Sequence, residues 1–357
     1  MSAAETPGWL SDPWNLGLAI ALTGLASWAA TGAVLRLLVA WRVYDKPNHR
    51  SSHGRARPRG GGLAVVPVAL VAWIATTLAG GGADRGFWLI VAGACLLGAI
   101  SWADDVKPRP ASLRFGVQVA AVTLGLWALD PAGLVFQGLL PPAADRLAAA
   151  LVWLWFINLF NFMDGIDGIT AVETVAIGGG LALVAVLQDL APVAIFQSAA
   201  LAAVAIGFLY WNWAPSRIFL GDVGSVPLGY LLGWLLVGAA ADGFWAVAVI
   251  LPLYYLADAT WTLLRRAGRQ EKLWRAHREH FYQRAVQRGF GHGAIALRIL
   301  LCNAVLVALA LAASVGGAPL LPWISLALAS LAVAVLLFIL ARQAPPSTRS
   351  ESAPPPD

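Results

Sequence analysis

The chain has 357 residues, of which 59% are hydrophobic and only 12% are charged. A soluble protein of this length could not bury so much apolar surface, so the composition indicates a membrane protein with several spans. The net charge of +5 is not gathered into a basic patch interleaved with aromatic side chains, so we expect no nucleic-acid partner. The two cysteines lie in apolar runs and indicate neither a disulfide framework nor a metal motif.

Eleven apolar segments follow one another along the chain, each near the length of about 20 residues that a bilayer requires. They lie at 15–40, 62–80, 87–103, 113–129, 147–163, 169–187, 192–211, 225–241, 244–264, 294–314 and 321–341. Because lipid offers backbone groups no other partner, we expect helices. The prediction is an all-α polytopic bundle of about eleven helices, with residues 1–341 as one integral-membrane domain. Residues 342–357, rich in Pro and Ser, are expected to form a disordered cytoplasmic tail.

The distribution of basic residues predicts the orientation. The N-terminal stretch has no positive charge and no small-residue cleavage site, so we interpret the first apolar run as a retained span. With the N-terminus outside, only Arg85 and Arg146 of the 24 Lys and Arg residues fall outside. By the positive-inside rule, the prediction is a multi-pass protein with its N-terminus outside and its polar clusters on the cytoplasmic face.

The first predicted inner loop, WRVYDKPNHRSSHGRARPRGGG, holds six basic residues together with His49 and His53. Positive charge at this place is a topology signal and also attracts anionic lipid, which accounts for part of the pattern. The three consecutive glycines and the prolines indicate a shaped loop as well.

The third apolar segment is followed by Asp104 and Asp105, and then by Lys107, Arg109 and Arg114. Adjacent residues on a helix point about 100° apart, so one acid can face a site while the other faces its partner. Taken alone, this cluster is equally well explained by ion pairs at the membrane surface.

The stretch NLFNFMDGIDGIT at 158–170 is the strongest signal in the chain. Asn158, Asn161, Asp164 and Asp167 recur at every third position, which on a helix keeps neighbouring groups close to one face. Two acids and two amides at the end of an apolar span are costly and indicate a site. The alternative reading is a helix cap, which needs one such residue and not four.

Two further polar clusters lie in later inner loops. Asp222 stands between Gly221 and Gly224 just before a span, where small neighbours leave room for a metal or phosphate; the alternative is a tight turn into a helix. His277 and His280 lie in a strongly basic loop. They are open to three readings: transition-metal ligands, phosphate donors or a plain surface helix. The many arginines favour an anionic ligand.

Five acids therefore converge on the predicted inner surface, with basic residues from three loops. Carboxylates with room for Mg²⁺, ringed by Arg, Lys and His, suit phosphoryl transfer. A site at the boundary of lipid and water indicates one water-soluble and one lipid substrate. A membrane transporter, the rival hypothesis, would place its acids near mid-membrane at broken helices, and a non-catalytic scaffold would not need all of them. The acids are Asp104, Asp105, Asp164, Asp167 and Asp222.

As a set, these motifs resemble those of the polyprenyl-phosphate N-acetylhexosamine-1-phosphate transferases, the family that includes the phospho-MurNAc-pentapeptide translocase. They are DKPNHRSSH…PRGGG at 45–62, ADD at 103–105, NLFNFMDGIDG at 158–168, IFLGDVGS at 218–225 and HREHFYQR at 277–284. The resemblance covers nearly the whole chain. It implies that residues 1–341 form a single transferase domain in the bacterial inner (plasma) membrane. The implied fold is a bundle of ten or eleven transmembrane helices with a cytoplasmic active site.

The implied reaction transfers a sugar 1-phosphate from a UDP-N-acetylhexosamine, or a derivative of one, to undecaprenyl phosphate. It releases UMP and starts a lipid-linked surface glycan such as O-antigen, a capsule or a wall polymer. The implied cofactor is Mg²⁺, with Mn²⁺ as the alternative. Besides the two substrates, the expected partner is membrane lipid, and a homodimer is left open.

Carried over residue by residue, the resemblance implies roles for the polar clusters. Asp104 and Asp105 match the acidic pair beside the lipid phosphate, and Lys107 and Arg114 are expected to hold that phosphate. Asp222 matches the metal ligand. Asp164 and Asp167 match acids that line the diphosphate pocket and are expected among the catalytic residues. Nucleotide or sugar binding is expected of Asn158, Asn161, Asn212, Phe219, His277, Arg278 and His280, with Phe219 stacking on uracil.

The last motif departs from the translocase, which has consecutive histidines. In HRxHxYQR, together with RSSH in the first loop, it resembles the branch that starts O-antigen and other surface glycans, so the sugar stays open and a pentapeptide-transferase activity is the alternative. The paired DG also suggests a CDP-alcohol phosphotransferase, but this sequence lacks the downstream Asp pair of that motif. We favour direct attack of the acceptor phosphate on the β-phosphorus. A two-step route through a phospho-aspartate stays open.

Overall fold

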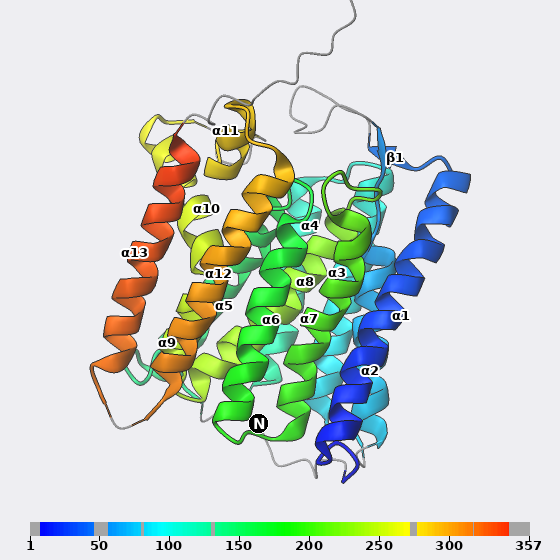
Figure 1. The fold of residues 1–357 in the computed structure, drawn as a ribbon. Coiled ribbons are helices and arrows are strands. Elements are labelled where there is room, and N and C mark those ends of the chain that lie inside the picture. The colour runs from blue at the N-terminus through cyan, green and yellow to red at the C-terminus, as the bar shows by residue number, and fades with distance from the viewer. Residues whose placement is uncertain are drawn as a thin grey trace, which may run out of the picture.

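The computed structural model describes residues 8–45, 56–79, 82–129, 133–271, 277–316 and 318–342. It confirms an all-α polytopic membrane protein, with helices that run roughly side by side (Figure 1). Within the described residues the helices are α1 (Pro13–Ala40), α2 (Gly62–Ala79), α3 (Arg85–Val106), α4 (Ala111–Trp127), α5 (Pro142–Phe162), α6 (Ile169–Leu187), α7 (Pro192–Asn212), α8 (Asp222–Ala241), α9 (Trp245–Ile250), α10 (Leu253–Gly268), α11 (Phe281–Gln287), α12 (His292–Ser314) and α13 (Leu321–Ala341).

Nine helices of the described chain are long and apolar enough to cross a bilayer. The apolar helix α4 is shorter, at 17 residues. The predicted segment 244–264 is divided into α9 and α10 at Leu251 and Pro252, where proline cannot donate a helical hydrogen bond. Each predicted segment therefore corresponds to a helix or to this helix pair, while eleven as the number of spans stays a prediction.

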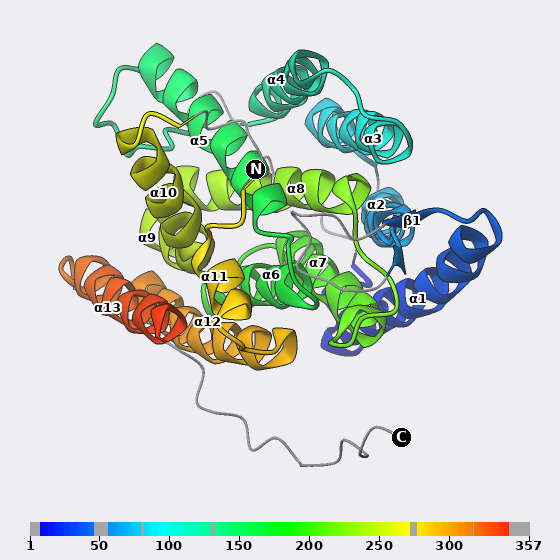
Figure 2. The same ribbon diagram turned by 90° about the horizontal axis from the view of Figure 1, so that it is seen from above.

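Helices α6 and α8 lie in the middle of the bundle and are buried along most of their length (Figure 2). Trp153 of α5 stacks on Tyr230 of α8 with ring centroids 5.0 Å apart, and its indole N–H donates to the Tyr230 carbonyl at 3.0 Å. A Cβ added at Gly233 would lie 2.5 Å from that indole, so glycine permits this close approach. These contacts hold the middle of α8 against α5.

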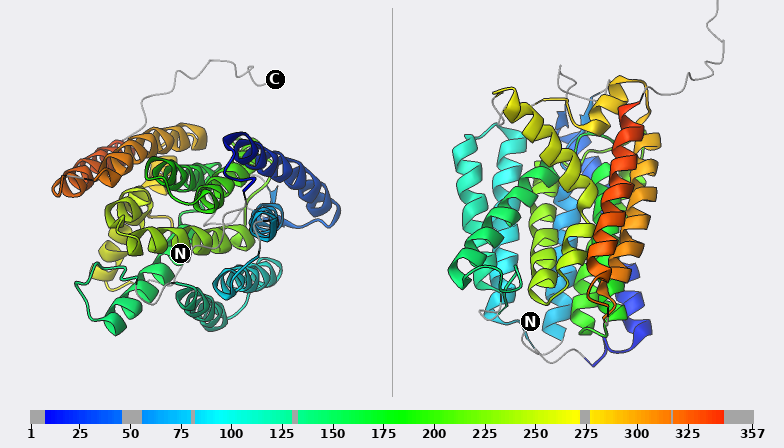
Figure 3. Two further views of the ribbon diagram at one scale, coloured as in Figure 1. Left: turned by 90° about the horizontal axis from the view of Figure 1, so that it is seen from below. Right: turned by 90° about the vertical axis from the view of Figure 1, so that its left-hand side faces the viewer.

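The two ends of the bundle differ in chemistry. At the lower end in Figure 1, Asp12 and Asp84 cap α1 and α3 through hydrogen bonds from Trp14 N (2.8 Å) and Phe87 N (2.7 Å). At the upper end, α3 and α5 finish, α8 begins and α11 lies across the connecting loops. We call this upper end the site end; Figure 3 shows the bundle from the opposite end and from the side.

A short hairpin at the site end joins the first inner loop to the loop between α7 and α8. Its strands β1 (Tyr44–Asp45) and β2 (Arg57–Pro58) are antiparallel, and Arg59 then forms a parallel bridge with Phe219. His49, His53 and residues 343–357 of the predicted tail lie outside the described residues.

Candidate functional site

The glycines before α2 let the first inner loop lie directly against the start of α8. Gly60 N and Gly61 N both donate to the Phe219 carbonyl, at 3.1 and 2.9 Å. A Cβ added at Gly62 would lie 2.2 Å from the Gly224 backbone, so no residue larger than glycine fits at this position. Two loops far apart in sequence are therefore locked together, and the side chain of Arg59 is delivered to the N-terminus of α8.

Asp105 and Asp222 face one another across this junction and share one guanidinium group. Arg59 Nη2 lies 2.9 Å from Asp105 Oδ1 and 2.7 Å from Asp222 Oδ1. Asp105 also accepts from the first backbone N–H groups of α8, Val223 N at 3.0 Å and Asp222 N at 3.3 Å, which places its negative charge at the positive end of the helix dipole. Gly221, with φ +77°, makes room for it, since a Cβ there would lie 2.8 Å from Asp105 Oδ2.

Asp104 points to a different partner, as the helical spacing predicts for adjacent residues. Its Oδ2 lies 2.8 Å from Arg114 Nη1 of α4, and its Oδ1 accepts from Arg109 N at 2.6 Å. Arg114 Nη1 is also 3.8 Å from Asp222 Oδ2. The ion pairs expected as the alternative are therefore present, and they connect Asp104 to the carboxylate cluster.

The stretch 158–170 does not keep its four polar residues on one helical face, contrary to the spacing argument. Helix α5 ends at Phe162, and the chain turns before α6 begins. Asn161, in the last turn of α5, accepts a hydrogen bond from Ser225 of α8 at 2.6 Å. Asp164, in the turn, accepts one from Thr170 at 2.7 Å. Burial raises the pKa of Asp164 to about 6, and the Thr170 hydroxyl opposes that rise.

A cavity of about 410 Å³ opens beside this cluster, between α3, α4, α5 and α8. Its wall combines polar residues, among them Arg114, Asn161 and Asp222, with apolar residues such as Phe115. Asn158 also lines it and donates to Gln118 of α4 at 2.8 Å. A cavity that presents charged groups together with apolar side chains suits a lipid with an anionic head group.

Asp167 and Asn212 are placed a little apart, where they hold loops in position. Asp167 accepts from Ser216 N at 3.1 Å and from the Ser216 hydroxyl at 2.8 Å, and its Oδ2 lies 3.3 Å from Nδ1 of His292 in α12. Burial opposes ionisation, but these hydrogen bonds from His292 and Ser216 outweigh it and lower the pKa of Asp167. Asn212 accepts from Gly168 N at 2.9 Å and donates to the Ile218 carbonyl at 2.9 Å.

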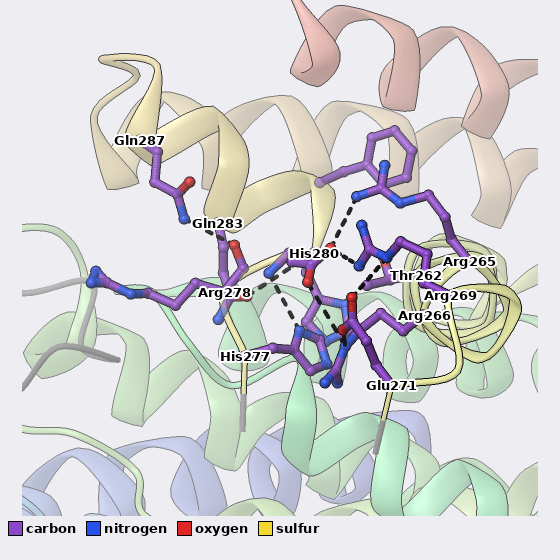
Figure 4. Close-up of polar contacts among 12 residues, drawn as sticks. Thr262, Arg265, Arg266, Arg269, Glu271, His277, Arg278, His280, Gln283 and Gln287 are labelled. Carbon is purple, nitrogen blue, oxygen red and sulfur yellow. Dashed lines mark hydrogen bonds and ion pairs between the residues drawn. The ribbon is translucent and has the colours of Figure 1, made fainter. Parts of the chain in front are cut away.

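The two histidines of the last inner loop have different surroundings (Figure 4). His280 is 2% exposed, and its Nδ1 lies 3.2 Å from Oδ1 of the buried Asp258 in α10. His277 is half-buried, and its Nδ1 accepts from Glu279 N at 3.3 Å. Burial lowers the pKa of His277 to about 4, and the neighbouring His280 and Arg266 contribute to the fall. The described residues contain no group of three His, Cys, Asp or Glu side chains that could hold a metal, which disfavours the transition-metal reading.

Glu279 is held by arginines from the end of α10. Its Oε2 lies 3.1 Å from Arg265 Nη2 and 2.5 Å from Arg269 Nη2. Glu271 Oε2 pairs with the buried Arg266 at 2.8 Å, and Figure 4 shows these arginines gathered beside the histidine loop. These ion pairs lower the pKa of Glu279 even though desolvation opposes the change. The cluster fixes the backbone on which His277 stands.

The remaining predicted residues occupy the edge of the site. Phe219 is half-buried beside Arg59 through the backbone bridge, Lys107 is exposed at the end of α3, and the carbonyl of the half-buried Arg278 accepts from Gln287 at 2.9 Å. The described part of the chain thus brings Asp104, Asp105, Arg114, Asn161, Asp164 and Asp222 together, and places Asp167 and His280 in supporting contacts.

Comparison with known proteins agrees with this geometry. The glycosyl transferase family 4 profile matches residues 87–240. A probable undecaprenyl-phosphate N-acetylglucosaminyl 1-phosphate transferase of Bacillus subtilis is 27% identical over 281 residues, 73% of this chain and 75% of that protein. A phospho-N-acetylmuramoyl-pentapeptide-transferase of Mycolicibacterium gilvum is 30% identical over 265 residues, 60% of this chain and 71% of the relative. The corresponding transferase of Mycobacterium ulcerans is 29% identical over 303 residues, which are 70% of this chain and 82% of that protein.

The chain belongs to glycosyl transferase family 4. It is therefore an enzyme, a membrane phosphotransferase of the polyprenyl-phosphate glycosyl-1-phosphate transferase type. Enzymes of this family depend on a metal ion. The transporter and scaffold readings are accordingly set aside.

The donor set of this family 4 enzyme fits a hard divalent cation. Within the described residues, four carboxylates meet around only two paired guanidinium groups, those of Arg59 and Arg114, which leaves an excess of negative charge. Mg²⁺ is commonly bound through one or two carboxylates plus substrate phosphates and water, so a cage of three side chains is not required. The carboxylates are Asp104, Asp105, Asp164 and Asp222.

Three residues of the site were not among those predicted from the sequence. Arg59 was counted only as part of a basic loop, although its place before GGG, where the chain must pack closely, was a usable signal. His292 and Ser216, which hold Asp167, carry no local signal, because their importance arises from contacts with a residue distant in the sequence.

Proposed function

We propose that this enzyme transfers an N-acetylhexosamine 1-phosphate from a UDP-sugar to undecaprenyl phosphate and releases UMP. One observation carries the proposal: a cluster of four carboxylates and two arginines lies at the end of the membrane helices, beside a cavity whose wall combines polar and apolar side chains. Such a place serves one water-soluble and one lipid substrate. The relatives' names point to a polyprenyl-phosphate acceptor, in agreement with it.

The acceptor phosphate is a dianion for much of the time at neutral pH, since its second pKa is about 6, so it needs little help from a base. Arg114, on the cavity wall, and the neighbouring Lys107 bind it. An acceptor oxygen attacks the β-phosphorus of the donor, and the bond from that phosphorus to the bridging oxygen breaks. UMP leaves with the bridging oxygen and the electron pair. Mg²⁺, or Mn²⁺, held by Asp222, would neutralise the diphosphate.

Direct attack is favoured over a phospho-aspartate because the candidate nucleophiles are engaged. Asp105 accepts two backbone hydrogen bonds and pairs with Arg59. Asp104 accepts from Arg109 N and pairs with Arg114. Because both carboxylates are already engaged by these partners, we assign Asp104 and Asp105 to orienting the acceptor and its proton, and Asp164 to the electrostatics of the diphosphate.

We assign the donor to compact UDP-N-acetylated hexosamines and their deoxy or amino derivatives, which start O-antigen or another lipid-linked surface glycan. Asn158, Asn161, Asn212 and Phe219 belong to the proposed nucleotide and sugar pocket, with Asp167 supporting it. In the last loop, His277, Arg278 and His280 form its sugar-diphosphate edge. The ion pairs of Glu279 with Arg265 and Arg269 hold that loop against the end of α10, and its departure from the consecutive histidines of the translocase favours a compact donor over the pentapeptide.

The test is an assay of the purified protein for UMP release, with undecaprenyl phosphate and a panel of UDP-sugars that includes the muramoyl-pentapeptide donor. We expect release with at least one UDP-N-acetylhexosamine and preference for it over the pentapeptide donor in competition. Asp222→Asn should lower turnover by about 100-fold or more, because it removes charge from the metal ligand.

Asp189→Asn is the matched control: it makes the same change at an exposed acid in the α6–α7 turn, at the opposite end, where φ is +50° and asparagine is tolerated. It should keep wild-type turnover. Absence of UMP release with every donor would contradict the proposed function, whereas preference for the pentapeptide donor would replace the sugar assignment alone.

A further inference from the structure

Arg59 occupies the place between two carboxylates where a cation is needed. A single nitrogen, Nη2, lies 2.9 Å from Asp105 Oδ1 and 2.7 Å from Asp222 Oδ1. No other guanidinium of the described residues bridges this pair, since Arg114 approaches Asp222 only at 3.8 Å. The positive charge of Arg59 therefore relieves the repulsion between Asp105 and Asp222.

The backbone of Arg59 is fixed while its side chain has room to move. The parallel bridge to Phe219 and the hydrogen bonds of Gly60 N and Gly61 N to the Phe219 carbonyl anchor the main chain. The side chain remains 34% exposed, against 2% for Asp105 and 19% for Asp222. Its four rotatable bonds allow the guanidinium to leave the carboxylates without any rearrangement of the loop.

We propose that Arg59 is an exchangeable counter-cation: in the metal-free enzyme it neutralises Asp105 and Asp222, and when the divalent cation enters it releases Asp222 and turns to the donor diphosphate. The proposal rests on the proposed function for the metal and the diphosphate. A Mg²⁺ ion at about 2.1 Å from the Asp222 oxygen that holds Nη2 at 2.7 Å would lie about 4 Å from that nitrogen, where the two positive charges repel one another and weaken the contact with Arg59.

This exchange predicts that removing Arg59 raises the affinity for the metal ion, whereas removing a residue that only supports the structure would lower that affinity. Without Arg59, the carboxylates keep their repulsion, so the metal-free protein loses stability and the metal meets no competitor. We therefore expect Arg59→Gln to bind Mn²⁺ about tenfold more tightly than the wild type, while its turnover falls because the diphosphate loses a partner. Arg59→Lys keeps the charge but loses the planar guanidinium group, so its Mn²⁺ affinity should lie between those of the wild type and Arg59→Gln.

The experiment measures Mn²⁺ binding to the full-length protein in detergent, without substrates, by electron paramagnetic resonance, and the thermal midpoint with and without Mn²⁺. Arg217→Gln is the matched control, because Arg217 is an exposed arginine of the neighbouring loop that packs over Tyr210 and Trp211. It should leave Mn²⁺ affinity and midpoint as in the wild type. In Arg59→Gln, the midpoint should fall without metal and recover with Mn²⁺.

Unchanged or weaker Mn²⁺ binding by Arg59→Gln would overturn the exchange. If that variant folds only when Mn²⁺ is present, the proposal is supported. If it folds under neither condition, Arg59→Lys decides: affinity above that of the wild type supports exchange, and wild-type or lower affinity overturns it. Because no donor is used, these outcomes are separate from the assay of UMP release, whose failure would remove the proposed reaction but leave the measured cation exchange in place.

Discussion

At the scale of single residues, the last loop presents one histidine as a neutral hydrogen-bond donor. His277 Nδ1 accepts from Glu279 N, so the proton of the neutral ring is on Nε2. Burial, with His280 and Arg266 nearby, lowers the pKa of His277 to about 4, and the ring is uncharged at neutral pH. A neutral N–H suits a sugar hydroxyl or carbonyl oxygen, while the adjacent arginines supply the charge that a phosphate requires.

We predict that His277→Gln weakens UDP-sugar binding, with a rise in the donor KM, but keeps the pH profile of the wild type between about pH 5.5 and 8. The ring does not titrate in that window. The measurement is kcat/KM for the donor against pH in both proteins. If kcat/KM of the wild type changes with a pKa near 6.5 and this change is absent from the variant, the neutral state of His277 would be contradicted.

The lowered pKa of His277 also makes the stability of the fold depend on pH. The unfolded chain, with a histidine pKa of 6.5, binds more protons than the folded one down to about pH 4, so the His277 contribution to stability is present at neutral pH. It is lost progressively as the pH falls from 6.5 to about 4.

At the scale of elements, α11 connects the last loop to the acidic turn between α5 and α6. Asp258 of α10 accepts from Phe281 N at 2.9 Å, and so caps the start of α11. From the same helix, Tyr282 donates its hydroxyl to the Phe162 carbonyl at 3.1 Å. A Cβ added at Gly165 would lie 2.1 Å from that hydroxyl, so the turn carrying Asp164 is packed directly under α11.

We predict that Gly165→Ala lowers stability by about 1–3 kcal/mol through overpacking and reduces turnover. Tyr282→Phe alone should cost about 1 kcal/mol for the lost hydrogen bond. In the double variant the clash with the hydroxyl is removed, so it should be more stable than the sum of the single changes predicts, with a coupling of about 1 kcal/mol. Thermal midpoints in detergent measure this, with Gly17→Ala, whose Cβ would meet open space, as control. Additive effects would show that the contact is unimportant.

At the scale of the whole molecule, the charge distribution and the fold agree on one functional end. The ends of α3, α5, α7 and α10 and the beginnings of α2, α4, α6, α8 and α12 all lie at the site end, with α11 (Figure 1). The predicted orientation places 22 of the 24 basic residues on this side, all but Arg85 and Arg146. That asymmetry supports a cytoplasmic site with a cytosolic nucleotide donor.

We predict that a cysteine introduced at the exposed Gln287 of α11 is labelled only after the cells are opened. A cysteine at the exposed Asp242, which follows α8 at the opposite end, should react with an impermeant thiol reagent on intact bacterial cells. Both changes are made in a chain in which Cys95 and Cys302 are replaced by alanine. Labelling of the Gln287→Cys protein from outside would reverse the orientation and exclude a cytosolic donor.

The sequence alone determined the helices and the gathering of acidic residues at one end of the bundle. Each long apolar run must satisfy its backbone internally in lipid, and polar residues such as Asp105 and Asp222 are costly anywhere but at a helix end or a site. Composition and spacing therefore sufficed to predict an all-α bundle and a cluster of acids at one surface.

Only the tertiary structure decided which groups meet. Arg59 contacts Asp222 across 163 positions of sequence, and Asp167, spaced like Asp164, turns instead to Ser216 and His292. The period of three residues held only for Asn158 and Asn161, since α5 stops at Phe162. Local periodicity fixes directions within one helix, whereas the partners of a side chain depend on how separate helices pack, and close glycine contacts such as Gly62 with Gly224 set that packing.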